Sequence, residues 1–160
     1  MNALPDPNNI ETQAGEFELE SFLPYRLSLL TNTISAGIAD SYRECHDISV
    51  TEWRVMAVLG RFPGLSASEV VERTAMDKVS ISRAVKSLEI KQLLERKTDA
   101  IDRRRQRLFI TRGAGEEVLD DVIPRAHRYE TALLQSLDND ELQSLLKAMM
   151  KLQQAAIDLQ

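Results

Sequence analysis

Three capping boxes constrain this sequence more than any other feature, because each one fixes the residue at which a helix begins. In a capping box a Ser or Asp stands three residues before a Glu, and each side chain accepts a hydrogen bond from the other residue's free backbone amide. The three boxes are Ser49–Glu52, Ser66–Glu69 and Asp138–Glu141. Pro63-Gly64 predicts the end of the first of these helices at about Arg61. The chain is therefore expected to be rich in helix.

Two longer segments have the periodicity of amphipathic helices, with apolar residues at every third or fourth position. They span residues 22–44 and 115–137. Pro24 fits only in the first turn of the former, and Pro124 is expected to bend the latter. The helix after Asp138 carries two apolar series with a heptad spacing, which suits packing along another long helix. From periodicity alone, these three helices either cover their own core or form an interface between two chains.

The stretch from residue 77 to residue 111 combines one helix with two strands. Asp77 is expected to cap a helix over residues 77–94, with one apolar face and one face of basic and hydroxyl-bearing side chains. Residues 94–97 and 107–111 predict a β-hairpin with a basic tip. Two short helices followed by such a hairpin have the element order of a winged helix-turn-helix. The predicted fold class is mainly α with a small β-hairpin wing (α+β), a winged helix-turn-helix plus a helical dimerisation region.

The net charge of -5 hides one basic stretch. From Asp77 to Arg107 the chain has ten basic and five acidic residues, whereas the remainder has ten basic and twenty acidic residues. A focused basic patch on an acidic body is typical of a nucleic-acid-binding surface, although a solvated charged surface would explain the charge alone equally well. A helix of this kind fits the major groove of duplex DNA, and a basic hairpin tip can reach the adjoining minor groove.

Composition and the absence of certain sequence motifs exclude several other classes of protein. With 160 residues, 43% of them hydrophobic, the chain has enough apolar content for one globular unit. No apolar run approaches the roughly 20 residues that span a bilayer, and the first residues lack a secretory signal, so we expect a cytoplasmic protein. The single Cys45 excludes an internal disulfide and a Cys-rich zinc site. Because no nucleophile–base pair, phosphate-cradling glycine loop or metal cluster is recognisable, we expect neither enzymatic activity nor a cofactor.

The predicted hairpin carries the most specific motif of the chain. Asp102-Arg103-Arg104 stands in its loop, and Thr111 follows the second strand. This Asp-x-Arg, at a fixed distance before an Ile-Thr pair, resembles the wing signature of the MarR family of winged helix-turn-helix transcriptional regulators. The resemblance covers residues from about 21 to 160. The family usually has a Gly three residues after the Thr, whereas here Gly115 comes one residue later, which a one-residue insertion at the start of the next helix would explain.

The resemblance implies how this region would bind double-stranded DNA. It implies that Arg104 enters the minor groove and that Asp102 holds this arginine through a charge-assisted hydrogen bond. Arg103 and Arg105 are expected to contact phosphates. The major-groove set consists of polar side chains on the helix that follows Asp77, namely Lys78, Ser80, Ser82, Arg83 and Lys86. A surface salt bridge at Asp102 and a solvated helix surface are the alternatives.

The resemblance also implies a homodimer and a small effector. The dimer would read a pseudopalindromic operator, as a repressor that a small aromatic or phenolic ligand releases. The candidate ligand-binding residues are Tyr25, Arg26, Trp53 and Arg54, because an indole offers a stacking face and an arginine can pair with a carboxylate. Packing in the core is the alternative for Trp53.

The predicted organisation has three parts, and two other functions stay open. Residues 1–20 are expected to form a mobile N-terminal arm, 21–48 and 112–160 the helical dimerisation region, and 49–111 the winged helix-turn-helix. A helical protein-interaction module would bind an acidic partner through the same basic patch, without DNA selectivity. A thiol-based oxidant-sensing regulator would use Cys45 beside His46, although the chain has no second cysteine to resolve an oxidised thiol.

Overall fold

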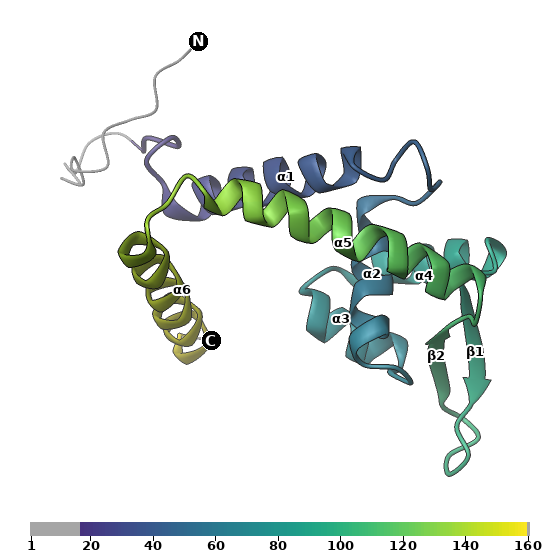
Figure 1. The fold of residues 1–160 in the computed structure, drawn as a ribbon. Coiled ribbons are helices and arrows are strands. Elements are labelled where there is room, and N and C mark those ends of the chain that lie inside the picture. Colours follow the sequence, from purple (N-terminus) through teal and green to yellow (C-terminus); the bar gives the residue numbers. More distant parts are fainter. Residues whose placement is uncertain (1–16, 160) are drawn as a thin grey trace.

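The computed structural model describes residues 17–159 and, within them, contains six helices and a two-stranded antiparallel sheet (Figure 1). The elements are α1 (Leu23–Asp40), α2 (Val50–Arg61), α3 (Ala67–Thr74), α4 (Lys78–Ile90), β1 (Leu94–Thr98), β2 (Gln106–Ile110), α5 (Ala114–Leu134) and α6 (Asn139–Asp158). The predicted fold class, mainly α with a small β-hairpin, is confirmed. Of the predicted N-terminal arm, residues 1–16 lie outside the described part of the chain.

The three capping boxes form as predicted and start α2, α3 and α6. At the start of α2, the Ser49 amide donates to the Glu52 carboxylate at 2.6 Å and the Glu52 amide donates to Ser49 Oγ at 3.2 Å. Asp77 caps α4, where its carboxylate accepts from the Ser80 amide at 2.8 Å. Pro24 lies in the first turn of α1, as expected. The starts of α2, α3, α4 and α6 are thus fixed by side chains within one turn.

The helix α4 ends at Ile90, four residues before the predicted end at 94. Gln92 adopts a left-handed backbone conformation with φ 59°. The Leu93 amide donates to the Leu88 carbonyl and the Gln92 amide donates to the Glu89 carbonyl, which together form a Schellman motif. The prediction missed this end because a glycine usually occupies the left-handed position, and here it is a glutamine.

The helices α2, α3 and α4, the hairpin and the first half of α5 share one hydrophobic core, which Ala39 and Tyr42 join from the end of α1. Met56 and Leu59 of α2, Ile81 and Leu88 of α4, and Leu108 of β2 are all buried in it. The hairpin is antiparallel and pairs residue 94 with 110 and residue 98 with 106. Because one face of α4 packs in this core, the opposite face is exposed to solvent.

The entry to α5 shows why Gly115 stands where it does. A Cβ at this position would overlap the Leu93 carbonyl and would lie 2.8 Å from Thr111 Oγ1. Thr111 Oγ1 donates to the Gln92 carbonyl at 2.7 Å and accepts from the Gly115 amide at 3.0 Å. The glycine therefore allows α5 to start directly against the end of β2.

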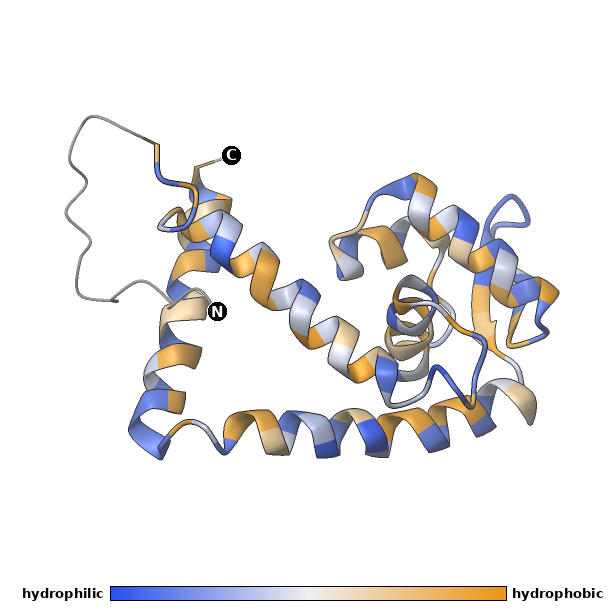
Figure 2. Ribbon diagram, turned by 90° about the horizontal axis from the view of Figure 1, so that it is seen from above, coloured by the Kyte–Doolittle hydropathy of each residue, from blue (hydrophilic) through white to orange (hydrophobic). Residues whose placement is uncertain are grey.

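The helices α1, α5 and α6 form the rest of the molecule. The helix α1 ends at Asp40 and α5 at Leu134, both earlier than the predicted limits of 44 and 137. The helices α1 and α5 meet where Gly37 faces Tyr129, since a Cβ on Gly37 would overlap the tyrosine ring. From that contact they diverge towards α6, which lies at the opposite end of the molecule from the hairpin (Figures 1 and 2).

Two of these helices, α1 and α6, keep much of their apolar surface exposed, whereas α5 buries Val118, Leu119 and Val122. The helix α6 has no buried residue, and Ala39 is the one buried residue of α1. Figure 2 shows apolar residues repeating along each of these helices. Exposed apolar side chains include Leu23, Leu27 and Leu30 of α1 and Leu145, Met149 and Leu152 of α6. Despite this apolar surface, no helix within residues 17–159 is long and apolar enough to cross a membrane.

Candidate nucleic-acid interface

The solvent face of α4 carries all five side chains of the predicted major-groove set. Ile81, Ala84, Val85 and Leu88 are buried on the other face. Lys78, Ser82, Arg83 and Lys86 are exposed, and Ser80 is half-buried at the edge of the exposed face. The structure therefore places these five residues on one helix surface that is accessible from outside.

Sequence reasoning missed two apolar residues on this surface. Val79 is 58% exposed and Ile90 is 73% exposed. Val79 lies one turn before Arg83 and next to Ser80, in the first turn of α4. An exposed aliphatic side chain at that place can contact the methyl group of a thymine. The helical periodicity contained the signal, because Val79 falls opposite the buried positions.

A depression between the start of α2 and α4 brings some of the predicted residues together. Its volume is about 280 Å³, and its lining includes Ser80 and Arg83 of α4 together with Ser49 and Thr51 of α2. Lys78, Ser82 and Lys86 do not line it. Of the predicted major-groove residues, two therefore line the depression beside α2, and the other three lie outside it.

Glu52, the buried acid that lines this depression, forms an ion pair within the protein. Glu52 is 4% exposed, and its Oε1 lies 3.0 Å from Lys91 Nζ. Burial would raise the pKa of Glu52, but hydrogen bonds from Ser49, Ser87 and Lys91 hold it below its ordinary value. The carboxylate is therefore charged at neutral pH, and Lys91 neutralises it within the fold.

Ion pairing separates the ten basic residues of the stretch 77–107 into three groups. Four of them make no ion pair with a carboxylate of residues 17–159: Lys78, Arg83, Lys86 and Arg103. Arg104 and Arg105 pair with Asp102 alone. The other four pair with acids elsewhere: Lys91, Arg96, Lys97 and Arg107. All six cations of the first two groups belong to the predicted DNA-binding set, and none of the third group does.

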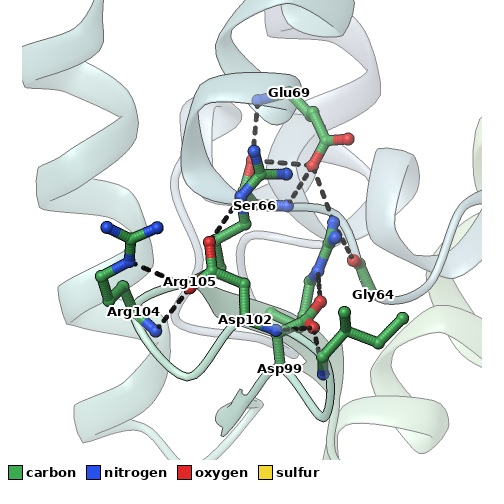
Figure 3. Close-up of polar contacts among 9 residues, drawn as sticks. Gly64, Ser66, Glu69, Asp99, Asp102, Arg104 and Arg105 are labelled. Carbon is green, nitrogen blue, oxygen red and sulfur yellow. Dashed lines mark hydrogen bonds and ion pairs between the residues drawn. The ribbon is translucent and has the colours of Figure 1, made fainter.

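The wing loop between β1 and β2 presents Arg104 to solvent (Figure 3). Asp102 Oδ1 accepts from the Arg104 amide at 3.1 Å and from Arg104 Nε at 3.2 Å, and Asp102 Oδ2 lies 3.5 Å from Arg105 Nε. These contacts with Arg104 lower the pKa of Asp102. The Arg104 side chain is nevertheless 92% exposed. The geometry agrees with the predicted pairing of Asp102 and Arg104 and leaves the outer nitrogens of the guanidinium accessible.

Arg107 belongs to the same loop region but points back into the protein. Its Nε donates to Asp99 Oδ2 at 2.6 Å, and one terminal nitrogen donates to Glu69 Oε2 at 3.1 Å and to the Gly64 carbonyl at 3.3 Å. Sequence reasoning did not single out Arg107, Asp99 or Glu69 as a group. The available signal was weak, because it consisted only of an Asp in a turn-forming segment and one more arginine in a basic stretch.

The four predicted ligand-binding residues do not form one cluster in a single chain. Trp53 packs against Tyr42, with ring centroids 6.0 Å apart, and Arg54 donates to Ser35 Oγ of α1 at 2.8 Å. Tyr25 and Arg26 are exposed near the start of α1, about 15 Å along the helix from Ser35 at 1.5 Å per residue. Trp53 contributes to the packing around the core, as the alternative interpretation held.

The segment after α1 holds Cys45 in a polar junction with α5. Cys45 is exposed, whereas the neighbouring His46 is half-buried and its Nε2 lies 2.8 Å from Asp121 Oδ2. Arg125 donates to Asp121 Oδ1 at 3.0 Å and to the Ser41 carbonyl at 3.0 Å. Hydrogen bonds from Arg125 and His46 lower the pKa of Asp121. Residues 17–159 contain no group of three or more His, Cys, Asp or Glu side chains that could hold a metal ion.

A capped helix pair, an exposed basic helix face and a hairpin with a solvent-exposed arginine define a winged helix-turn-helix DNA-binding protein. The sequence profile of the MarR family matches residues 46–105, which comprise α2 to α4, β1 and the whole wing loop between β1 and β2. Residues 46–105 are therefore similar to the DNA-binding region of MarR-family transcriptional regulators.

Individual relatives agree with this assignment. The transcriptional regulator HosA of Escherichia coli O127:H6 is 25% identical over 109 residues, which are 68% of this chain and 80% of HosA. A MarR/EmrR family regulator from Acinetobacter sp. ADP1 has the same fold, with a TM-score of 0.79 and 24% identity over 89% of this chain and 99% of that one. Bordetella bronchiseptica BpsR, whose DNA binding is regulated by 6-hydroxynicotinic acid, has a TM-score of 0.75 and 18% identity over 87% and 98%.

Proposed function

We propose that this protein is a homodimeric repressor that binds a pseudopalindromic operator through α4 and the wing. The observation that carries the proposal is the distribution of ion pairs. Lys78, Arg83, Lys86 and Arg103 have no carboxylate partner among the described residues, whereas the other basic side chains of the stretch are neutralised by acids of the fold or by Asp102. Unpaired cations gain most from phosphate, because they lose no internal ion pair on binding.

The proposed docking follows from the shapes of the two elements. The helix α4 would lie in the major groove, with Ser80, Ser82 and Arg83 near base edges and Lys78 and Lys86 near phosphates. Arg104 would enter the adjoining minor groove while Asp102 fixes its Nε, and Arg103 and Arg105 would contact phosphates. In this arrangement phosphate contacts supply affinity, and the groove contacts of α4 and Arg104 supply specificity.

The dimer would form through the exposed apolar faces of α1 and α6, together with α5. The helix α6 buries none of its residues within the chain although it is 20 residues long. Its heptad-spaced Leu145 and Leu152 are both 44% exposed or more. A second copy of the chain would cover this surface and place two copies of α4 one helical turn of DNA apart, which suits an inverted repeat.

A small aromatic or phenolic effector would control the repressor from the region between the dimerisation helices and the winged domain. Arg54 and Trp53 lie there, where α2 contacts α1 through Ser35. Tyr25 and Arg26 would complete the site from exposed positions on α1. Regulation of BpsR by an aromatic acid supports this class of ligand. An arginine would pair with the carboxylate, and the indole would stack on the ring.

Selection of genomic DNA tests the proposed function directly. Purified protein is incubated with pooled fragments of the host genome at near-physiological salt, and the retained DNA is sequenced. Enrichment of one inverted-repeat sequence is expected. Uniform retention of all fragments would contradict sequence-specific binding, and retention of none would favour a protein-interaction module. Addition of hydroxylated aromatic acids should then lower retention of the selected sequence, and unchanged retention over a panel of such acids would contradict the proposed ligand class.

A further inference from the structure

Arg107 differs from the other arginines of the wing in the direction of its side chain. Its side chain is 26% exposed, whereas those of Arg104 and Arg105 are 92% and 66% exposed. Its guanidinium contacts Asp99 at 2.6 Å, Glu69 at 3.1 Å and the Gly64 carbonyl at 3.3 Å. Because Nε and one terminal nitrogen are engaged by the protein and the side chain is largely covered, Arg107 offers DNA less than Arg104 does.

Asp99 connects Arg107 to the wing loop. Its Oδ2 accepts from Arg107, while its Oδ1 accepts from the Ile101 amide at 2.8 Å and the Asp102 amide at 3.0 Å. One carboxylate therefore fixes the backbone of the residue that holds Arg104. These hydrogen bonds from Asp102, Arg107 and Ile101 lower the pKa of Asp99 to about 2, so the carboxylate is charged at every pH at which DNA binding is measured.

Glu69 connects Arg107 to the helix-turn-helix. Its Oε2 accepts from the Ser66 amide at 2.8 Å and from Ser66 Oγ at 2.7 Å in the capping box of α3, and it also accepts from Arg107 (Figure 3 shows Glu69, Ser66 and Asp99). Arg107 is 38 residues away from Glu69 in the sequence. The guanidinium thus joins the second strand of the wing to the first turn of α3.

We propose that Asp99, Arg107 and Glu69 form a clasp that orients the wing, and that Arg107 is a positioning residue for the DNA contact of Arg104. The path runs from Arg107 to Asp99, from Asp99 to the Asp102 amide, and from Asp102 to Arg104. This inference rests on the proposed insertion of Arg104 into the minor groove. A hairpin tip without the clasp would have to be ordered during binding, at a cost in affinity.

The geometry of the clasp requires the planar fork of an arginine. The contacts to Asp99 and Glu69 use two different nitrogens of one guanidinium. A lysine keeps the charge but presents a single ammonium, which cannot reproduce this pair of contacts at the same positions. The variant Arg107→Lys therefore separates orientation of the wing from its charge.

The experiment is a double-mutant cycle on the operator fragment obtained by genomic selection, with affinity measured by fluorescence anisotropy. Arg107→Lys is expected to weaken binding by about three- to tenfold in the natural background, the range for ordering one or two side chains on binding. In the Arg104→Ala background the same change should weaken binding less than about twofold, because the contact it positions is already lost. Asp99→Asn should behave like Arg107→Lys. Equal losses in both backgrounds, or natural affinity in Arg107→Lys, would overturn the clasp.

A second measurement without DNA keeps the clasp separate from the proposed function. Hydrogen exchange of the amides of residues 98–106 is compared between the natural chain and Arg107→Lys, with thermal unfolding as the check that both are folded. Faster exchange confined to this loop supports the clasp even if the natural chain selects no operator, in which case only the proposed function fails. Unchanged exchange of the loop in a folded Arg107→Lys protein would refute the clasp whether or not the natural chain binds DNA.

Discussion

The winged domain and the helix α6 differ in how far their side chains find partners within the chain. In the winged domain, Met56, Leu88 and Leu108 are fully buried, and acids of the fold engage Lys91 and Arg107. In α6 the apolar side chains stay exposed although the helix is well capped. Apolar burial within one chain is thus concentrated in the winged domain and the adjoining part of α5, and the proposed dimer would bury the apolar face of α6.

The largest expected effect comes from truncating a methionine in each region. Met56 is buried in the winged core, and Met149 is 53% exposed on α6. Met56→Ala should lower the free energy of unfolding by about 2–5 kcal/mol, because it removes buried methylene groups and leaves a cavity. Met149→Ala should instead raise the dimer dissociation constant about tenfold, as expected of a central interface residue. Urea denaturation and analytical ultracentrifugation measure the two quantities.

The proposed difference between the winged domain and α6 is contradicted if Met56→Ala and Met149→Ala have the same effect. A loss of unfolding free energy in Met149→Ala that does not depend on protein concentration would mean that α6 packs on its own chain. A natural chain that stays monomeric at micromolar concentration would mean that the apolar face of α6 has another function.

The next largest effect concerns the charged surface of the winged domain. Arg104→Ala should weaken operator binding by about 1–3 kcal/mol and leave the dimer intact, because the side chain is exposed and contacts only Asp102. Arg128→Ala is the matched control, since Arg128 is an exposed arginine of α5 outside the wing. Anisotropy titrations on the selected operator measure both. Equal affinities for the two variants would remove Arg104 from the DNA contact.

Removing the N-cap of α2 or of α6 tests whether the winged domain and α6 unfold separately. Ser49→Ala removes the cap of α2 in the winged core and should lower the free energy of unfolding by about 1 kcal/mol. Asp138→Ala removes the cap of α6, which packs on little of its own chain, and should chiefly increase fraying of that helix. Urea denaturation gives the first effect, and hydrogen exchange in the first turn of α6 gives the second. If Asp138→Ala destabilised the winged core as much as Ser49→Ala does, the two regions would fold as one unit.

The smallest effect is the pH dependence of the wing. The pKa of Asp99 is lowered from 3.8 to about 2 in the folded chain, so its charged form is favoured by folding. Its stabilising effect is therefore fully present above pH 3.8 and is lost as the pH falls towards 2. The protection factors of the wing-loop amides, corrected for the intrinsic exchange rate at each pH, should fall over that interval in the natural chain but not in Asp99→Asn. A carboxyl resonance of Asp99 that titrates near pH 4 would contradict the clasp.

The sequence predicted the starts of the helices better than their ends. Asp77, Ser49 and Ser66 each bond to an amide three residues on, so the signal and the structure lie within one turn. The end of α4 depends on Gln92 in a left-handed conformation, which no residue type at that position announces. Similarly, the helix α1 stops at Asp40 although its apolar periodicity continues to Tyr42, a buried core residue.

The sequence identified individual candidate residues for DNA contact, but not how the fold arranges them. Lys78, Arg83 and Arg104 were recognisable from the basic helix face and from the wing motif. The exposure of Val79 followed from the same periodicity, because position 79 falls opposite the buried positions of α4. The separation of Tyr25 from Trp53 could not be seen in the sequence, since it depends on the direction in which α1 crosses α2.

By itself, the sequence determined the helix starts, the hairpin and the identity of the basic face, because capping, turn formation and amphipathic periodicity act between residues a few positions apart. Only the tertiary structure decided which of the basic side chains are free. Arg107 meets Glu69 across 38 residues and Lys91 meets Glu52 across the α2–α4 contact, whereas Arg83 and Lys86 meet no acid of the described chain. Coulomb attraction acts through space, so the pairing of charges follows the packing of the core and not the order of the residues.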